Sequence, residues 1–182
     1  MFSISTKFER RAIFRFLTLL FVTFSVILTA ITIFTDRWFQ ERNISLNVWR
    51  WNGLWRICSE RTNQNFTRVM LCRKLNEDEI TGTIKAARIL LSTSLVINCL
   101  VNVVAILMKI FKRKLMMDVL SVMILISNIL LTSGLSVFVD KYETFGSARY
   151  VYGYSMVTGW ISFACLVVAN LFSLLSRNDK EK

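Results

Sequence analysis

The 182-residue chain contains no histidine and no proline, and only 12 acidic residues stand against 23 lysines and arginines. Without histidine, the chain lacks the commonest catalytic base and the commonest metal ligand. Its serines and threonines have no imidazole to activate them. The four cysteines are too few and too dispersed for a zinc framework. The sequence therefore predicts no enzyme, no metal site and no cofactor.

Charged residues are also missing from four long apolar stretches, each 19 to 21 residues in length: 16–34, 89–108, 119–139 and 156–175. At ~1.5 Å per residue, each stretch reaches across a ~30 Å hydrocarbon core as a helix. Buried helices of a soluble protein are the alternative, but such helices need a polar face. The first stretch is longer than the apolar part of a cleaved signal peptide and has no A-x-A site after it. We therefore expect four retained membrane spans in a single domain, 1–182.

Lysine and arginine in the flanks of the spans predict their orientation. Basic residues gather before the first span, between the second and third spans, and after the fourth: Lys7, Arg10, Arg11, Arg15, Lys109, Lys112, Arg113, Lys114, Arg177, Lys180 and Lys182. These segments are expected in the cytosol, together with both termini. Residues 35–88 then form an outer loop, although its ten basic residues weaken an argument from charge alone. The net charge of +11 follows this topology and indicates no nucleic-acid partner.

The outer loop contains features of an exported segment. Its Asn43-Ile44-Ser45 and Asn65-Phe66-Thr67 are the two N-glycosylation sequons of the chain, and Asn65, farther from the first span, is the better acceptor. Cys58 and Cys72 lie in the same loop, in an oxidising compartment. The other cysteines lie within spans, where we interpret them as apolar fillers.

The composition of the outer loop predicts a small sheet. Apolar and polar residues alternate over 44–48, and a second candidate strand covers Phe66 to Cys72. A cysteine pair separated by thirteen residues could tie these strands together, which would be worth ~3 kcal/mol. We expect Trp38, directly after span one, at the membrane–water interface, and Trp55 packed under the sheet.

Asparagines within the spans indicate contacts between helices. Asn98 and Asn102 share a face of the second span, whereas Asn128 and Asn170 lie at mid-depth in the third and fourth spans. A substrate pathway is the alternative to such structural hydrogen bonds. No Asp, Glu, Lys or Arg lies inside a span, which argues against a proton-coupled transporter.

The loop motif resembles the W…GLW…C…C signature of the claudin superfamily, which includes claudins, peripheral and epithelial myelin-type membrane proteins, lens fibre intrinsic protein and calcium-channel gamma subunits. The matching residues, with the basic residue before span two, are Trp38, Trp51-Asn52-Gly53-Leu54-Trp55, Cys58, Cys72 and Arg88. The resemblance implies an all-α membrane fold, a left-handed four-helix bundle with a small extracellular antiparallel β-sheet in the first outer loop. It also implies a disulfide between Cys58 and Cys72.

The resemblance implies a non-enzymatic, integral plasma-membrane protein at cell–cell contacts or junctions. We expect membrane lipid around it and lateral association, through its sheet, with further copies of itself or with related four-span proteins. The alternative is an auxiliary, gamma-type subunit that changes the gating or trafficking of an ion channel or receptor.

Overall fold

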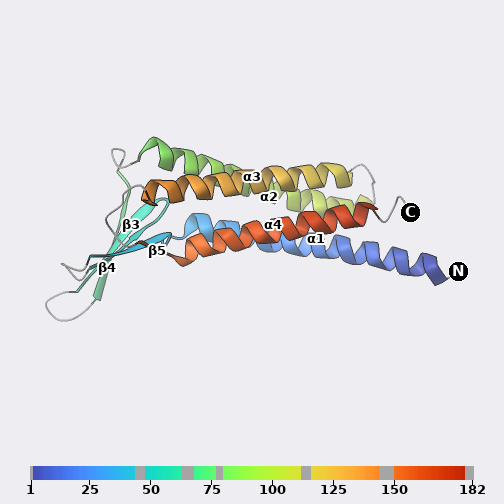
Figure 1. Cartoon of the computed structure of the whole chain (residues 1–182), viewed down its shortest axis with the longest axis horizontal. Coiled ribbons are helices and arrows are strands. Elements are labelled where there is room, and N and C mark those ends of the chain that lie inside the picture. Colours follow the sequence, from blue (N-terminus) through green and yellow to red (C-terminus); the bar gives the residue numbers. More distant parts are fainter. Residues whose placement is uncertain are drawn as a thin grey trace.

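The computed structural model describes residues 2–43, 48–62, 68–76, 80–111, 116–143 and 150–178. Four helices and five strands follow one another along the chain as α1 (Phe2–Phe34), β1 (Phe39–Asn43), β2 (Val48–Asn52), β3 (Arg56–Thr62), β4 (Arg68–Lys74), α2 (Gly82–Phe111), α3 (Met116–Glu143), β5 (Tyr150–Tyr152) and α4 (Tyr154–Asn178). The helices lie side by side and the sheet lies at one end of the bundle (Figure 1). The expected fold class, four apolar helices with a small antiparallel sheet, is confirmed.

Each helix contains one of the four expected spans. The membrane-compatible segments are 23 to 27 residues long: Ala12–Phe34, Gly82–Met108, Asp118–Asp140 and Tyr154–Ser176. Helix α1 has 33 residues and begins ten residues before its span, so it continues past the apolar part. In Figure 1 its N-terminal end reaches beyond the ends of the other helices, on the side away from the sheet.

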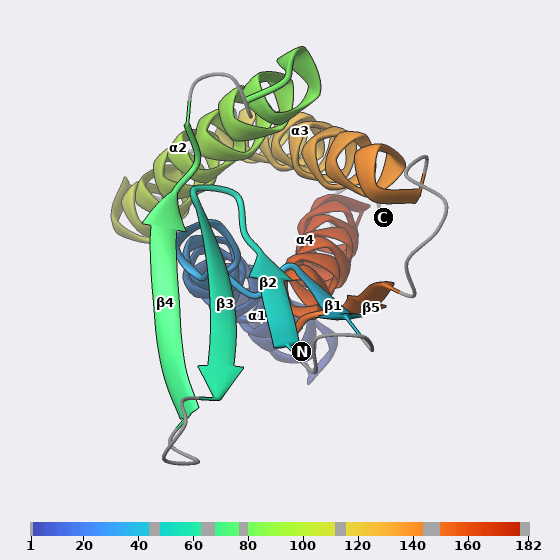
Figure 2. The ribbon, with the colours of Figure 1, turned by 90° about the vertical axis from the view of Figure 1, so that its left-hand side faces the viewer.

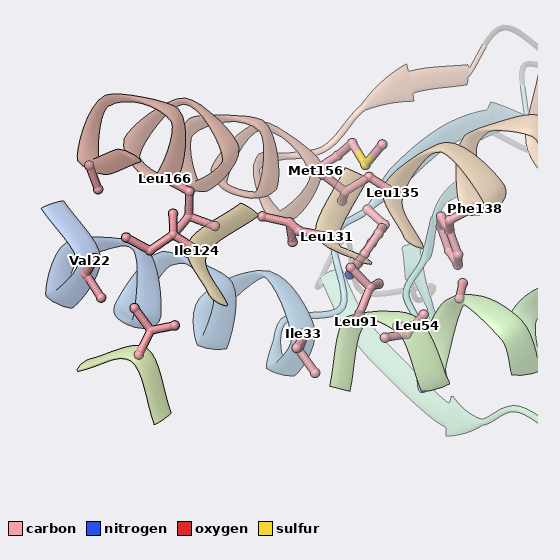
Figure 3. Packing of buried hydrophobic residues seen from close by; sticks show 14 of the residues in the cluster. Val22, Ile33, Leu54, Leu91, Ile124, Leu131, Leu135, Phe138, Met156 and Leu166 are labelled. Atoms are coloured by element: carbon pink, nitrogen blue, oxygen red, sulfur yellow. The ribbon is translucent and has the colours of Figure 1, made fainter. Parts of the chain in front are cut away.

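The helices form a ring in which α1 contacts α2 and α4, and α3 contacts the same two neighbours. Leucine, isoleucine and valine side chains fill the interior between them, including Val22, Ile124, Leu131 and Leu166 (Figure 3). The outward faces are equally apolar and exposed, as at Phe24 and Leu100. An apolar surface of this extent belongs in a bilayer, because in water it would be an association surface.

Glycines allow the helices to approach closely near the sheet. A Cβ at Gly159 would lie 2.8 Å from Leu135 Cδ2 and 3.1 Å from Thr32 Cγ2, and one at Gly134 would lie 2.7 Å from Leu91 Cγ. Gly159 follows Ser155 by four residues, the small-xxx-small spacing typical of packed membrane helices.

The five strands form one antiparallel sheet in the order β4-β3-β2-β1-β5. Figure 2 shows this sheet across the end of the bundle, with β4 and β5 at its two sides. Strand β4 overlaps the expected 66–72 strand, whereas β3 has no counterpart among the expected strands. Of the expected 44–48 strand, Val48 begins β2, and residues 44–47 lie outside the described residues.

Strand β5 is an addition to the expected sheet, because it comes from the segment before α4 and not from the first outer loop. It pairs with β1 through Phe39↔Tyr152, Gln40↔Val151 and Glu41↔Tyr150. The segment before α4 therefore supplies the edge strand next to β1. Three residues give too little periodicity for such a short strand to be found from sequence.

Candidate functional site at the outer end of the bundle

Trp38 is the buried centre of the junction between bundle and sheet. Its side chain is 0% exposed, and its ring lies 4.5 Å from that of Phe138 in α3. Phe39 packs on Phe138 as well, with 5.8 Å between ring centres, and on Tyr152 at 5.4 Å. The expected interfacial position of Trp38 was therefore wrong. Its indole Nε1 is buried without a hydrogen-bond partner in the described structure.

Trp55 is less covered than the expected packed position would make it, since 39% of its surface is exposed. Its Nε1 donates a hydrogen bond of 3.0 Å to the carbonyl oxygen of Ile33 near the end of α1. The Arg88 guanidinium lies 4.6 Å from the centre of the Trp55 ring, and Arg88 Nε donates to the Leu54 carbonyl oxygen at 2.9 Å. Leu54 itself is fully buried. Three motif residues thus join the sheet to α1 and α2.

Two glycines permit backbone crossings at this junction. Gly53 N–H donates to the Arg56 carbonyl oxygen at 2.9 Å, and a Cβ on Gly53 would lie 2.7 Å from Asp36 Cα. Gly153 lies directly against the carbonyl group of Arg37, leaving no space for a Cβ. Its N–H donates to the Trp38 carbonyl oxygen at 2.8 Å. Both glycines stand in stretches that resemble the family, but sequence reasoning gave Gly153, directly before α4, no role in such a crossing.

The predicted disulfide is present between two directly opposed residues of β3 and β4. The Cα atoms of Cys58 and Cys72 are 4.1 Å apart, and their sulfur atoms are bonded. Cys58 is buried, whereas Cys72 is exposed on the edge strand. The bond therefore ties the outermost strand to the rest of the sheet.

The structure describes the asparagine of one of the two sequons. Asn43 is the last residue of β1, and Asn65 lies outside the described residues, in the segment between β3 and β4. Glycosylation at either residue stays a prediction.

Charged groups at the junction are partly shielded from water. Burial raises the pKa of the Asp36 carboxyl above its ordinary value of 3.8, and the positive charge of Arg56 offsets part of this rise. The guanidinium carbon of Arg37 lies 5.2 Å from the Trp51 ring centre and 5.8 Å from that of Tyr154. These contacts hold the α1–β1 connection against the sheet and the start of α4.

The edge strand β4 presents a continuous apolar surface. Val69, Met70 and Leu71 are 39%, 47% and 55% exposed. Because consecutive residues of a strand point to opposite faces, both faces of β4 are apolar here. Among the described strands, β4 pairs only with β3, so its outer side carries open backbone groups.

A seam of hydroxyl groups joins α1 to α4 below the sheet. Ser162 Oγ lies 2.8 Å from both Ser25 Oγ and Thr29 Oγ1, and Thr32 Oγ1 lies 3.0 Å from Thr158 Oγ1. These pairs satisfy polar groups that would otherwise be unpaired in the apolar interior. Serine and threonine at helical spacing on two spans are the signal for this seam, and sequence reasoning about asparagine missed it.

The asparagines contribute to the same interior. Asn98 Nδ2 lies 3.5 Å from Thr29 Oγ1, and Asn102 Nδ2 donates to Thr23 Oγ1 at 3.1 Å. The Oδ1 atoms of Asn98, Asn128 and Asn170 have no partner in the described structure. The first two asparagines thus connect α2 to α1. No group of three potential metal-ligating side chains occurs among the residues that the structure describes.

Comparison with family models matches residues 12–172 to the PMP-22/EMP/MP20/Claudin family. The chain belongs to this family. The match covers all four spans, the sheet and the junction, so the arrangement described above is that of a multi-pass, claudin-like membrane protein. Comparison with curated proteins returns no match.

Proposed function

We propose that this claudin-like protein is a non-enzymatic plasma-membrane protein that acts at cell–cell contacts by lateral association of its outer sheets. The edge strand β4 carries this proposal, because Val69, Met70 and Leu71 are exposed beside open backbone groups. An exposed edge strand of this kind is a template for pairing with another chain.

A second copy of the chain offers two edges to β4. Antiparallel pairing of β4 with itself about Leu71 would place Arg68 opposite Lys74, and like charges directly opposed are unfavourable. The other edge, β5, exposes Val151 and Tyr152, and the strand itself contains no basic residue. We therefore favour contact between β4 of one molecule and β5 of the next.

This contact is heterologous and extends into a row. Every neighbouring pair in the order β4-β3-β2-β1-β5 is antiparallel, so β4 and β5 run in the same direction. In a copy related by translation, β5 would therefore lie parallel to β4 of the first molecule. Figure 2 places the two edges on opposite sides of the bundle. Translation in the membrane plane keeps every copy in the same orientation, as association within one membrane requires.

Cysteine cross-linking tests the proposed row. In a Cys99→Ser, Cys165→Ser background, Met70→Cys and Val151→Cys together should give a ladder of oligomers on a non-reducing gel after mild oxidation of intact cells. Each single variant should stay monomeric, and Met70→Cys paired with Trp160→Cys, on α4, controls for random collision. Dimers from Met70→Cys alone, or no ladder in protein concentrated at contacts, would contradict the β4–β5 contact.

The alternative function, an auxiliary subunit of an ion channel or receptor, has a direct test. Affinity purification of the full chain in mild detergent should recover the protein with itself and with other contact proteins. Recovery of a channel or receptor in fixed stoichiometry, with no self-association, would favour the auxiliary function instead.

The proposed topology places both termini in the cytosol and the sheet outside the cell. Its support is that the N-terminal end of α1 and the C-terminal end of α4 lie away from the sheet, at the end where lysine and arginine gather (Figure 1). We expect a glycosidase to increase the gel mobility of the protein, and Asn65→Gln to remove most of that shift, with Asn43→Gln removing less. Labelling of an N-terminal tag on intact cells would overturn this topology.

A further inference from the structure

Arg15 lies on the face of α1 that points into the bundle. The buried positions Thr18, Val22, Ser25 and Thr29 recur along this helix at intervals of three or four residues, and Arg15 precedes Thr18 by three. The side chain is part-buried, and its Nε is buried without a hydrogen-bond partner in the described structure. A buried cationic donor with no acceptor is costly unless a partner is supplied from outside.

Ser176 supplies a second unpartnered group at the same end of the bundle. It is 0% exposed near the end of α4, and its Oγ has no partner in the described structure. Phe172, one helical turn earlier, stacks on Phe14 with 6.0 Å between ring centres. Phe172 also stacks on Phe21 at 5.9 Å, so it lies level with the middle of the stretch from Phe14 to Phe21. Ser176, one turn farther along the antiparallel α4, therefore lies near the level of Phe14 and Arg15.

The Ser176 hydroxyl differs from the other buried hydroxyl groups described in α1 and α4, which are hydrogen-bonded. Nearer the sheet, the buried hydroxyls of Ser25, Thr29 and Ser162 all bond across the helices. At the opposite end, Arg15 Nε and the Ser176 hydroxyl have no hydrogen-bond partner in the described structure. The guanidinium can only donate and the serine hydroxyl can also donate, so one acceptor can satisfy both groups, and the charge of arginine favours an anion.

The position along the membrane normal identifies the class of anion. Arg15 is the fourth residue of the span Ala12–Phe34, about 4.5 Å along the helix axis from its start. This is the depth at which lipid headgroups meet the hydrocarbon core, and basic pockets between spans at this level bind lipid phosphates. Arg10, one and a half turns earlier and exposed, adds positive charge in the aqueous layer.

We propose that Arg15 and Ser176 hold the phosphate group of an anionic phospholipid headgroup between α1 and α4, at the end of the bundle away from the sheet. The guanidinium donates to the phosphate oxygens, and the serine hydroxyl donates to the same group. The site is independent of the contact function proposed above, because it lies at the other end of the molecule. A lipid bound here would hold α1 and α4 together where their hydroxyl seam ends.

Binding of short-chain phosphatidylinositol bisphosphate to the full chain in neutral detergent tests the site, with short-chain phosphatidylcholine as the zwitterionic comparison. Arg15→Gln should weaken binding of the anionic lipid about tenfold or more, since a hydrogen-bonded charge is removed. Arg10→Gln makes the same change of charge on the same helix and should weaken it about threefold at most. Equal losses in the two variants would mean diffuse attraction and would overturn the site.

Two further variants and one further ligand complete the test. Ser176→Ala should weaken binding without changing the charge, and Arg15→Lys should restore only part of it, because lysine lacks the planar fork of donors. These variants keep the proposal testable if Arg15→Gln does not fold. Inorganic phosphate should compete only at far higher concentration than the lipid. Binding of free phosphate as tight as that of the lipid, or no effect of Ser176→Ala and Arg15→Lys, would refute the lipid site.

Discussion

Replacing Trp38 and Trp55 separately by phenylalanine should cost more folding stability at Trp55 than at Trp38. Side-chain exposure alone predicts the reverse order. Trp38 is 0% exposed and Trp55 is 39% exposed, so a burial argument predicts the larger loss at Trp38. The hydrogen bonds predict otherwise. Trp38 Nε1 is buried and unpartnered in the described structure, whereas Trp55 Nε1 donates to the Ile33 carbonyl oxygen at 3.0 Å.

The magnitudes follow from these contacts. Trp38→Phe removes the unpaired donor, a gain of about 1–3 kcal/mol. The smaller ring forfeits about 1–2 kcal/mol of packing against Phe138, so the net change should lie between about 1 kcal/mol of destabilisation and about 2 kcal/mol of stabilisation. Trp55→Phe loses a hydrogen bond worth about 1 kcal/mol and weakens a cation–π contact with Arg88 worth about 0.5–2 kcal/mol. It should therefore destabilise by about 2 kcal/mol.

The assay is unfolding of purified protein in mixed micelles by titration with a denaturing detergent, followed by the loss of helical circular dichroism. Trp38→Ala should destabilise by about 3–5 kcal/mol, which confirms that the Trp38 site is packed. Trp160→Phe, on an exposed position of α4, is the matched control and should stay within about 0.5 kcal/mol of the parent. A Trp38→Phe variant as unstable as Trp38→Ala, or a neutral Trp55→Phe, would refute the hydrogen-bond argument.

Three other changes at the outer end have expected outcomes. Gly153→Ala should destabilise by at least about 1–3 kcal/mol, because its methyl group meets the Arg37 carbonyl, and lower surface expression with normal stability would contradict this. Cys58→Ser with Cys72→Ser should cost about 3 kcal/mol, and peptide mapping of the parent without reductant should find no free thiol at either residue. Because burial raises the pKa of Asp36, its protonated carboxyl favours folding, so the stability of the parent should fall as pH rises through that raised pKa. Asp36→Asn should flatten this pH dependence in a pH series of melting curves. A variant with the same pH profile as the parent would refute the prediction.

The sequence by itself determined the four spans, because uninterrupted uncharged runs of this length have only one favourable environment. It also indicated the cysteine pair, since Cys58 and Cys72 lie with a family motif in the segment between the first two spans. Their separation suits two adjacent strands, and the structure places them directly opposite each other in β3 and β4.

Only the tertiary structure decided which tryptophan is buried. Trp38 is covered by Phe138, a residue of α3 far along the chain, whereas Trp55 is turned toward α1 by the Ile33 carbonyl and Arg88. The residues next to each tryptophan in the sequence do not indicate these partners. Trp38 directly follows a span and Trp55 lies in a motif, and neither position shows which of the two rings is buried. The same reason applies to β5 and to Gly153, whose roles depend on the backbone of β1 and of residues 37 and 38. Burial and pairing are properties of neighbours that the fold brings together, so they became visible only when the helices and the sheet were in place.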